Sequence, residues 1–94
     1  MSITKPKLGQ HFLEDEETLE KIIKTASIKK TDVILEIGPG KGQLTKELAK
    51  KAKKVIAVEK DLTLARDLKE KYKSINNIKI ITADILDFSL SKDI

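Results

Sequence analysis

The chain has 94 residues, with 19 lysines and arginines against 15 acidic residues, so its formal net charge is +4. This length allows one small domain, and no apolar run approaches the ~20 residues that a membrane-spanning helix needs. The sequence has no cysteine, which excludes disulfides, cysteine-ligated zinc and thiol nucleophiles, and its single histidine, His11, argues against a histidine metal site or a catalytic triad.

The predicted elements alternate between helix and strand. Residues 1–13 show no regular pattern. A helix is expected over about 16–27, because apolar residues recur there with the period of an amphipathic helix. The run 33–37 is apolar on both faces, as a central parallel strand should be, and it ends at a glycine-rich loop over 38–42.

The remaining elements continue the alternation. They are a helix over about 42–53, a strand over 55–59, a helix over 62–73 and a strand over 78–82. In the helix over 62–73, the helical spacing of Ala65, Leu68 and Tyr72 predicts that all three face the core. This order and spacing imply right-handed crossovers and a parallel sheet. The predicted fold class is therefore α/β, with three strands in the spatial order 3-2-1, the first half of a doubly wound, Rossmann-like sheet.

Residues with chemical potential follow the three predicted strands. Gly38, Gly40 and Gly42 form a turn before a helix, where a ligand can approach the backbone and meet unpaired N–H groups. Glu59 ends the second strand, where a carboxylate can accept hydrogen bonds from both hydroxyls of a ribose. Asp84 follows the third strand and can accept from an adenine amine. Since ligands of such sheets bind at the carboxyl edge, these residues predict one adenosine pocket.

Each feature also has a more common interpretation when taken alone. Glycine-rich turns are often structural, Glu59 by itself would more often be a solvated strand end, and Asp84 can form an Asx turn. Their joint placement after successive strands favours binding of an adenosine cofactor.

The glycine spacing favours S-adenosylmethionine over a dinucleotide. A dinucleotide fingerprint has the pattern G-x-G-x-x-G, whereas here the third glycine comes one place early and position 43 is Gln43. The acidic Glu36 before the loop suits a cationic amino-acid ligand better than a pyrophosphate. A P-loop is excluded because Gly-Lys-Ser/Thr is absent, and an NAD-binding half remains a distant alternative.

Four segments carry a more specific signal. They are Gly9-Gln10-His11-Phe12-Leu13, Glu36-Ile37-Gly38-Pro39-Gly40-Lys41-Gly42, Val58-Glu59-Lys60-Asp61 and Ala83-Asp84-Ile85-Leu86. Together they closely resemble the ribosomal RNA adenine-N6 dimethyltransferases of the small subunit, relatives of the erythromycin-resistance methyltransferases. The resemblance implies a cytoplasmic, S-adenosylmethionine-dependent methyltransferase. The cofactor-binding residues expected on all these grounds are His11, Leu13, Gly38, Gly40, Glu59 and Asp84.

The resemblance also implies individual roles. The segment with His11 and Leu13 would fold over the methionine end of the cofactor. Gly38 would line the amino-acid moiety, Glu59 would hold the ribose and Asp84 would meet the adenine. The substrate of this family is a pair of adjacent adenines near the 3′ end of small-subunit rRNA, whose exocyclic amines are methylated out of the base stack.

The family's Asn-hydrophobic-Pro-Tyr/Phe motif, which holds the target amine, has no counterpart here. Residues 1–94 are therefore interpreted as the N-terminal part of a methyltransferase domain, truncated before that motif, with no catalytic residue and no metal site. The alternatives are an S-adenosylmethionine-binding module that transfers nothing, and a nucleic-acid-binding or structural fragment.

Two further expectations concern the surface. The strand 33–37 would lack a partner on one edge, and one face of the sheet would be apolar and uncovered, so the isolated chain is expected to associate as a symmetric dimer. Residues 41–54 hold six lysines against one acid. This suits contact with rRNA phosphates, although a solvated helix face is the commoner interpretation.

Overall fold

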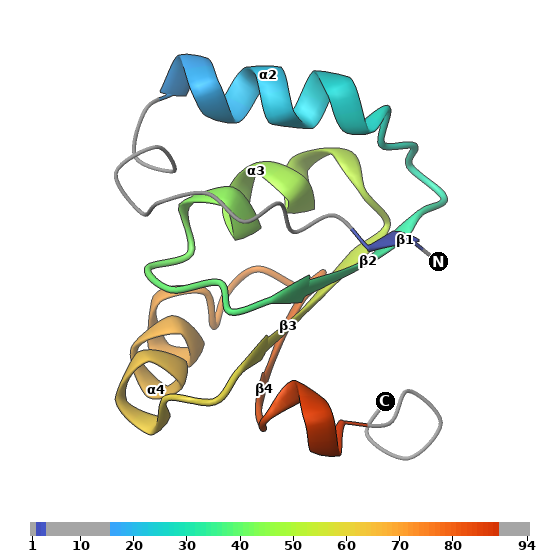
Figure 1. Cartoon of the computed structure of the whole chain (residues 1–94). Helices are drawn as coiled ribbons and strands as arrows, with labels where there is room; N and C mark the ends of the chain where they lie inside the picture. Colours follow the sequence, from blue (N-terminus) through green and yellow to red (C-terminus); the bar gives the residue numbers. More distant parts are fainter. Residues whose placement is uncertain (1, 4–15, 89–94) are drawn as a thin grey trace.

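The computed structural model describes residues 2–3 and 16–88 of the chain, and Figure 1 shows their arrangement. The elements are β1 (Ser2–Ile3), α2 (Glu16–Ala26), β2 (Val33–Ile37), α3 (Gln43–Lys51), β3 (Lys54–Glu59), α4 (Leu62–Lys71), β4 (Ile78–Thr82) and the short 3-10 helix η1 (Ile85–Asp87). The three predicted helices and three predicted strands are all present, with ends that shift by at most two residues.

The sheet is parallel throughout, with the strand order β1-β2-β3-β4. The predicted order of the three longer strands is confirmed. The short β1 was not predicted: Ser2 pairs with Ile34, and Ile3 pairs with Leu35. The expectation of irregular structure at residues 2–3 is therefore wrong, because a two-residue strand is too short to leave a periodic pattern. The expectation that one edge of the strand 33–37 lacks a partner is wrong at Ile34 and Leu35, where β1 pairs with it.

One face of the sheet is covered by helices. In Figure 1, α3 lies over β2 and β3, and α2 lies across α3. The shared core of these elements consists of Leu19, Ile34, Leu44, Leu48, Ala52 and Val55. Burial of these apolar side chains is the main force that holds the helices to the sheet.

The opposite face of the sheet carries a second apolar cluster. Leu35, Ile56 and Val58 form its centre, and Ile85 and Phe88 near η1 pack against them. The prediction of an apolar second face is confirmed. The expectation that this face is uncovered is wrong for its centre, because Leu35, Ile56 and Val58 keep only 5%, 1% and 2% of their surface exposed.

Gly42 fixes the junction between the glycine-rich loop and α3. Its φ angle is 83°, in the left-handed region that favours glycine. A Cβ atom at this position would lie 2.5 Å from Leu68 Cδ2 and 2.8 Å from Tyr72 Cε2. The loop can therefore pack against α4 at this point only because residue 42 has no side chain.

Replacing Gly42 by alanine is expected to lower the free energy of unfolding by about 2–4 kcal/mol, because strain at positive φ adds to overpacking against α4. Urea denaturation followed by circular dichroism measures the change. Gly38→Ala is the matched control: its φ is also positive, at 66°, but no atom lies within 4 Å of the added Cβ. Equal losses in the two variants would contradict the packing argument.

Candidate functional site

The carboxyl ends of β2, β3 and β4 converge on one cavity. The Gly38 N–H donates to the Val58 carbonyl at 2.9 Å, and the Ala83 N–H donates to the Glu59 carbonyl at 3.1 Å. These two bonds extend the hydrogen bonding of the parallel sheet by one residue beyond β2 and β4, into the loops that follow these strands. The cavity has a volume of about 200 Å³ and is lined by Ile37, Gly38, Val58, Glu59, Lys60, Ala83, Asp84 and Ile85.

The structure thus brings Gly38, Glu59 and Asp84 together around this cavity. Gly40 does not line the cavity, but its N–H donates a hydrogen bond to Glu59, which does. His11 and Leu13 lie outside the described residues. Three predicted site residues therefore share one space, and a fourth supports it.

Glu59 is the most buried charged side chain in the lining of the cavity. Only 6% of its surface is exposed. Its Oε1 accepts a hydrogen bond from the Gly40 N–H at 3.3 Å, and its Oε2 accepts one from the Asp61 N–H at 3.0 Å. Glu59 is therefore not a solvated strand end. Each carboxylate oxygen has further acceptor capacity, which suits a pair of hydroxyl donors.

Asp84 caps the short helix η1 at the other wall of the cavity. Its Oδ1 accepts from the Leu86 N–H at 2.9 Å, and its backbone carbonyl accepts from the Asp87 N–H at 2.9 Å. The Asx-turn interpretation is thus confirmed. The turn engages one of the two carboxylate oxygens, and it fixes the direction of the carboxylate beside the cavity.

Glu36 does not face the cavity, contrary to the argument that linked it to a cationic ligand. Its side chain is completely buried, and its Oε1 accepts a hydrogen bond from the Thr45 hydroxyl of α3. Glu36 lies two residues before Gly38, on the side of β2 that α3 covers. It therefore anchors the start of α3 to the sheet, and the preference for S-adenosylmethionine loses this part of its basis.

Tyr72 is a residue whose role at the site the sequence did not reveal. Its spacing from Ala65 and Leu68 predicted a core position, and it is 5% exposed. Its hydroxyl, however, donates to the Gly42 carbonyl at 2.6 Å, and the neighbouring Lys71 Nζ donates to the Lys41 carbonyl at 3.1 Å. The end of α4 thus holds two consecutive carbonyls of the glycine-rich loop.

The environment of Tyr72 predicts a pH-dependent contribution to stability. Burial raises its pKa, and the charges of Glu36 and Glu47 raise it further. Because the pKa of Tyr72 is raised in the folded state, its contribution to the free energy of unfolding is complete below the unfolded-state pKa of ~10. This contribution is lost as the pH rises through the folded-state pKa. Because the chain has one tyrosine, tyrosinate absorbance reports this group alone, and we expect it to titrate above the ordinary range.

Tyr72→Phe provides the control for this titration, because lysines also lose their charge at alkaline pH. The variant is expected to unfold with a weaker pH dependence than the parent in this range. A parent tyrosine that titrates at or below its ordinary pKa would contradict the buried hydrogen bond.

Two further properties concern metal-binding clusters and the length of helices among the described residues. Within residues 2–3 and 16–88, no cluster of three or more His, Cys, Asp or Glu side chains could hold a metal ion. None of the helices in this part of the chain is both long and apolar enough to cross a membrane.

The chain matches the family model described as ribosomal RNA adenine dimethylase over residues 1–94. It is 51% identical over 82 residues to ribosomal RNA small subunit methyltransferase A of Dehalococcoides mccartyi. The aligned residues cover 87% of this chain and 28% of that relative.

Solved structures show the same likeness. The 23S rRNA methyltransferase ErmE superposes with a TM-score of 0.75 at 40% identity, covering 80% of this chain and 31% of that one. A dimethyladenosine transferase from Plasmodium falciparum superposes with a TM-score of 0.73 at 36% identity, covering 84% and 30%. The fold is thus that of Rossmann-like methyltransferases, and the chain spans under a third of the length of these relatives.

Proposed function

This chain belongs to the ribosomal RNA adenine dimethylase family, and we propose from that premise that it forms the cofactor-binding part of an S-adenosylmethionine-dependent rRNA adenine-N6 dimethyltransferase. The names of the relatives, among them ribosomal RNA small subunit methyltransferase A, support small-subunit rRNA as the substrate. In this proposal residues 1–94 are the N-terminal part of the methyltransferase domain, contribute no catalytic residue and act in the cytoplasm.

The observation that carries the proposal is the Glu59 carboxylate. It is nearly buried, oriented by two backbone N–H groups and placed on the same cavity as Gly38 and Asp84. The space in front of Gly38 also fits a ligand, because a Cβ there would meet no atom within 4 Å. A buried acceptor beside an open glycine is the arrangement that an adenosine cofactor requires.

When bound, S-adenosylmethionine supplies a methyl group on a positively charged sulfur, which an amine can attack. The residues of this chain would bind and orient it. Glu59 accepts from the ribose hydroxyls, Asp84 accepts from the adenine amine, and Gly38 leaves room for the amino-acid moiety. Gly40 holds Glu59 in position through its N–H. Fixing the cofactor in one orientation lowers the barrier by alignment.

His11 and Leu13 complete the proposed set of binding residues. Both belong to the segment that resembles the family's N-terminal motif, and we place them over the methionine end of the cofactor. Their contribution would be to exclude water from the methyl group.

Isothermal titration calorimetry of the chain with S-adenosylmethionine tests the proposal, with NAD as the control ligand. We expect saturable binding of S-adenosylmethionine alone. Glu59→Gln removes the charge while keeping the shape of the side chain, and it should weaken binding on the order of 10- to 100-fold, since hydrogen bonds to a charged group are lost.

Asp67→Asn is the matched control variant, because Asp67 is exposed on α4 and does not line the cavity. It should bind S-adenosylmethionine as the parent does. A folded parent that binds no S-adenosylmethionine, or that binds NAD equally well, would overturn the proposed cofactor.

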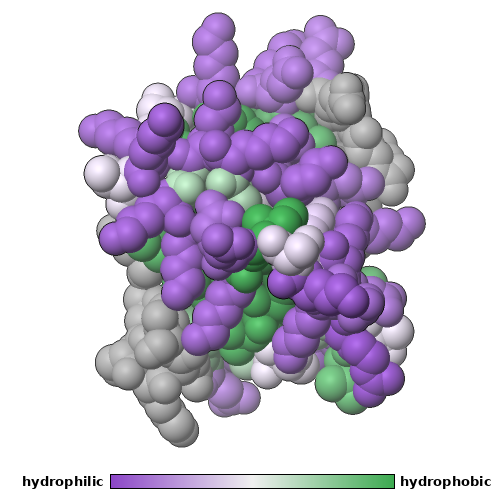
Figure 2. Space-filling model, turned by 180° about the vertical axis from the view of Figure 1, so that it is seen from behind, coloured by the Kyte–Doolittle hydropathy of each residue, from purple (hydrophilic) through white to green (hydrophobic). Residues whose placement is uncertain are grey.

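We also propose that the isolated chain can form a symmetric dimer through the side of the sheet that carries η1, since β1 already occupies the edge at Ile34 and Leu35. Leu86, which is 90% exposed beside this face, gives it apolar surface to bury. On the face in Figure 2, the largest apolar patch lies near the centre and is bordered by hydrophilic side chains. Sedimentation velocity at rising concentration should show a dimer, and a monomer throughout would exclude it.

A further inference from the structure

The charges of the chain are divided between the two edges of the sheet. At the amino edge, the N–H groups of Lys53 and Lys54 donate to the Asp32 carbonyl at 2.8 and 3.4 Å, so segments 27–32 and 51–54 meet there. These two segments contain five lysines and one acid. At the cavity edge, segments 38–42, 59–61 and 83–87 contain two lysines and four acids.

The basic character continues onto the adjoining helices. A groove of about 570 Å³ between α2 and α3 is lined by three lysines and two acids, together with the apolar Ile23 and Ile28. The charged residues of this lining are Lys24, Lys50, Lys51, Glu20 and Glu47. The lysines of the groove and of the amino edge form one group, which we call the lysine edge. Its members are Lys24, Lys29, Lys30, Lys50, Lys51, Lys53 and Lys54.

Three acids, Glu20, Asp32 and Glu47, lie among these lysines and neutralise part of their charge. Lys50 pairs with Glu47 at 3.1 Å. The Asp32 carboxylate accepts a hydrogen bond from the Lys29 backbone N–H at 2.9 Å. Within the described residues, the exposed side chains of Lys30, Lys51 and Lys53 form no ion pair. The seven lysines therefore outnumber the three acids near them, and the excess of positive charge is available to an external anion.

Helix dipoles account for only part of the lysine edge. Lys24, Lys50 and Lys51 lie in the last turns of α2 and α3, where a cation is favoured by the helix dipole. The helix dipole does not explain the remaining four lysines, because they lie outside the helices. They are Lys29, Lys30, Lys53 and Lys54. A solvated helix face is thus an incomplete explanation of this group.

We propose that the lysine edge is a docking surface for the phosphates of RNA, separate from the cofactor cavity. This inference rests on the proposed function for the identity of the polyanion. The two edges are separated by the length of a five-residue strand, roughly 17 Å. That separation exceeds the Debye length of ~10 Å at 0.1 M salt. RNA bound at the lysine edge would therefore be held by phosphates distant from the methylated adenines, without altering the cofactor site.

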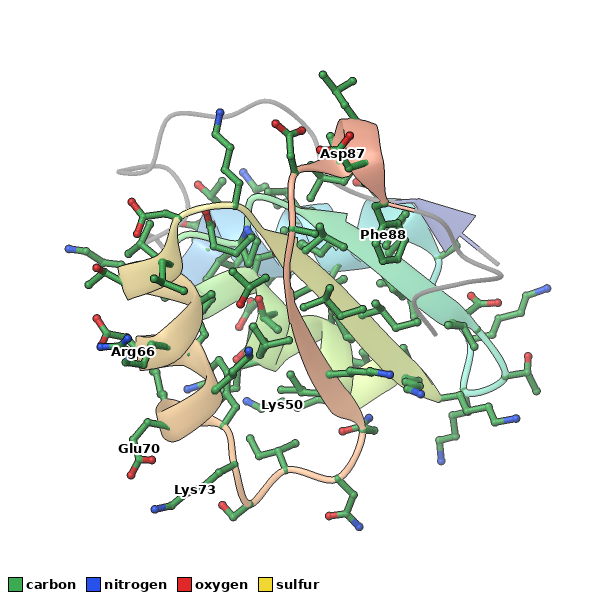
Figure 3. All side chains as sticks on the ribbon, turned by 90° about the horizontal axis from the view of Figure 1, so that it is seen from below. Lys50, Arg66, Glu70, Lys73, Asp87 and Phe88 are labelled. Carbon is green, nitrogen blue, oxygen red and sulfur yellow. The ribbon has the colours of Figure 1, made fainter. Side chains whose placement is uncertain are left out.

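The test compares two variants of equal net charge by fluorescence anisotropy with a short fluorescein-labelled RNA duplex. Lys30, Lys51 and Lys53 are replaced by glutamine in the first variant, and Lys46, Arg66 and Lys69 in the second. Figure 3 shows Arg66 on α4, and none of the three residues of the second variant lines the groove between α2 and α3. The first variant should reduce the slope of log affinity against log salt by about 2, and the second by less than about 0.5.

Three outcomes would overturn the docking surface. They are no RNA binding by the parent at low salt, equal losses in the two variants, and binding to vesicles of phosphatidylserine and phosphatidylcholine but not to RNA. Circular dichroism of each variant confirms that it is folded.

Calorimetry with S-adenosylmethionine on the same proteins separates the two proposals. The lysine-edge variant should bind the cofactor as the parent does. If the parent binds RNA but no S-adenosylmethionine, the proposed function is overturned, whereas the proposed RNA docking at the lysine edge is not. A parent that binds the cofactor, with unchanged RNA affinity in the first variant, would overturn the lysine edge alone.

Discussion

The burial of the Glu59 carboxylate is the constraint on which the arrangement of the cavity depends. A carboxylate that is 6% exposed is stable in its charged form only if hydrogen bonds replace the lost water. Here the replacements are the N–H groups of Gly40 and Asp61, one from each neighbouring loop. The loop after β2 and the loop after β3 are therefore held in one relative position by the same group that is proposed to bind the ribose.

Glu36 shows why the same residue type at a nearby strand end has a different role. Glu36 on β2 pairs in register with Ala57 on β3. Glu59 lies two residues after Ala57 on β3, so its side chain is on the same face of the sheet as that of Glu36. That difference places Glu36 beneath α3, where Thr45 donates to it, and Glu59 at the edge, where a ligand can reach it. Register and helix cover, rather than residue type, decide which carboxylate is structural.

The sequence was a good guide to the parts of the fold that repeat a pattern. Periodic apolar residues revealed the helices and the three longer strands, and the glycines and acids after successive strands indicated where the cavity lies. The contacts that depend on tertiary packing could not be read in this way. Helical spacing indicated that Tyr72 is buried, but the partner of its hydroxyl, Gly42, lies 30 residues away. Likewise β1 consists of two residues, whose pairing depends on β2 and not on their own pattern.

The role of α4 follows from its position in the chain, where it connects β3 to β4. The helix connects the strand that carries Glu59 with the strand that precedes Asp84, and its last residues also hold the loop that contains Gly38. All three walls of the cavity are thus joined through contacts within this chain. The Tyr72 ring occupies the space beside Gly42, so a side chain at position 42 would collide with it. The shape of the proposed cofactor site is therefore set by packing behind the cavity as much as by the residues that line it.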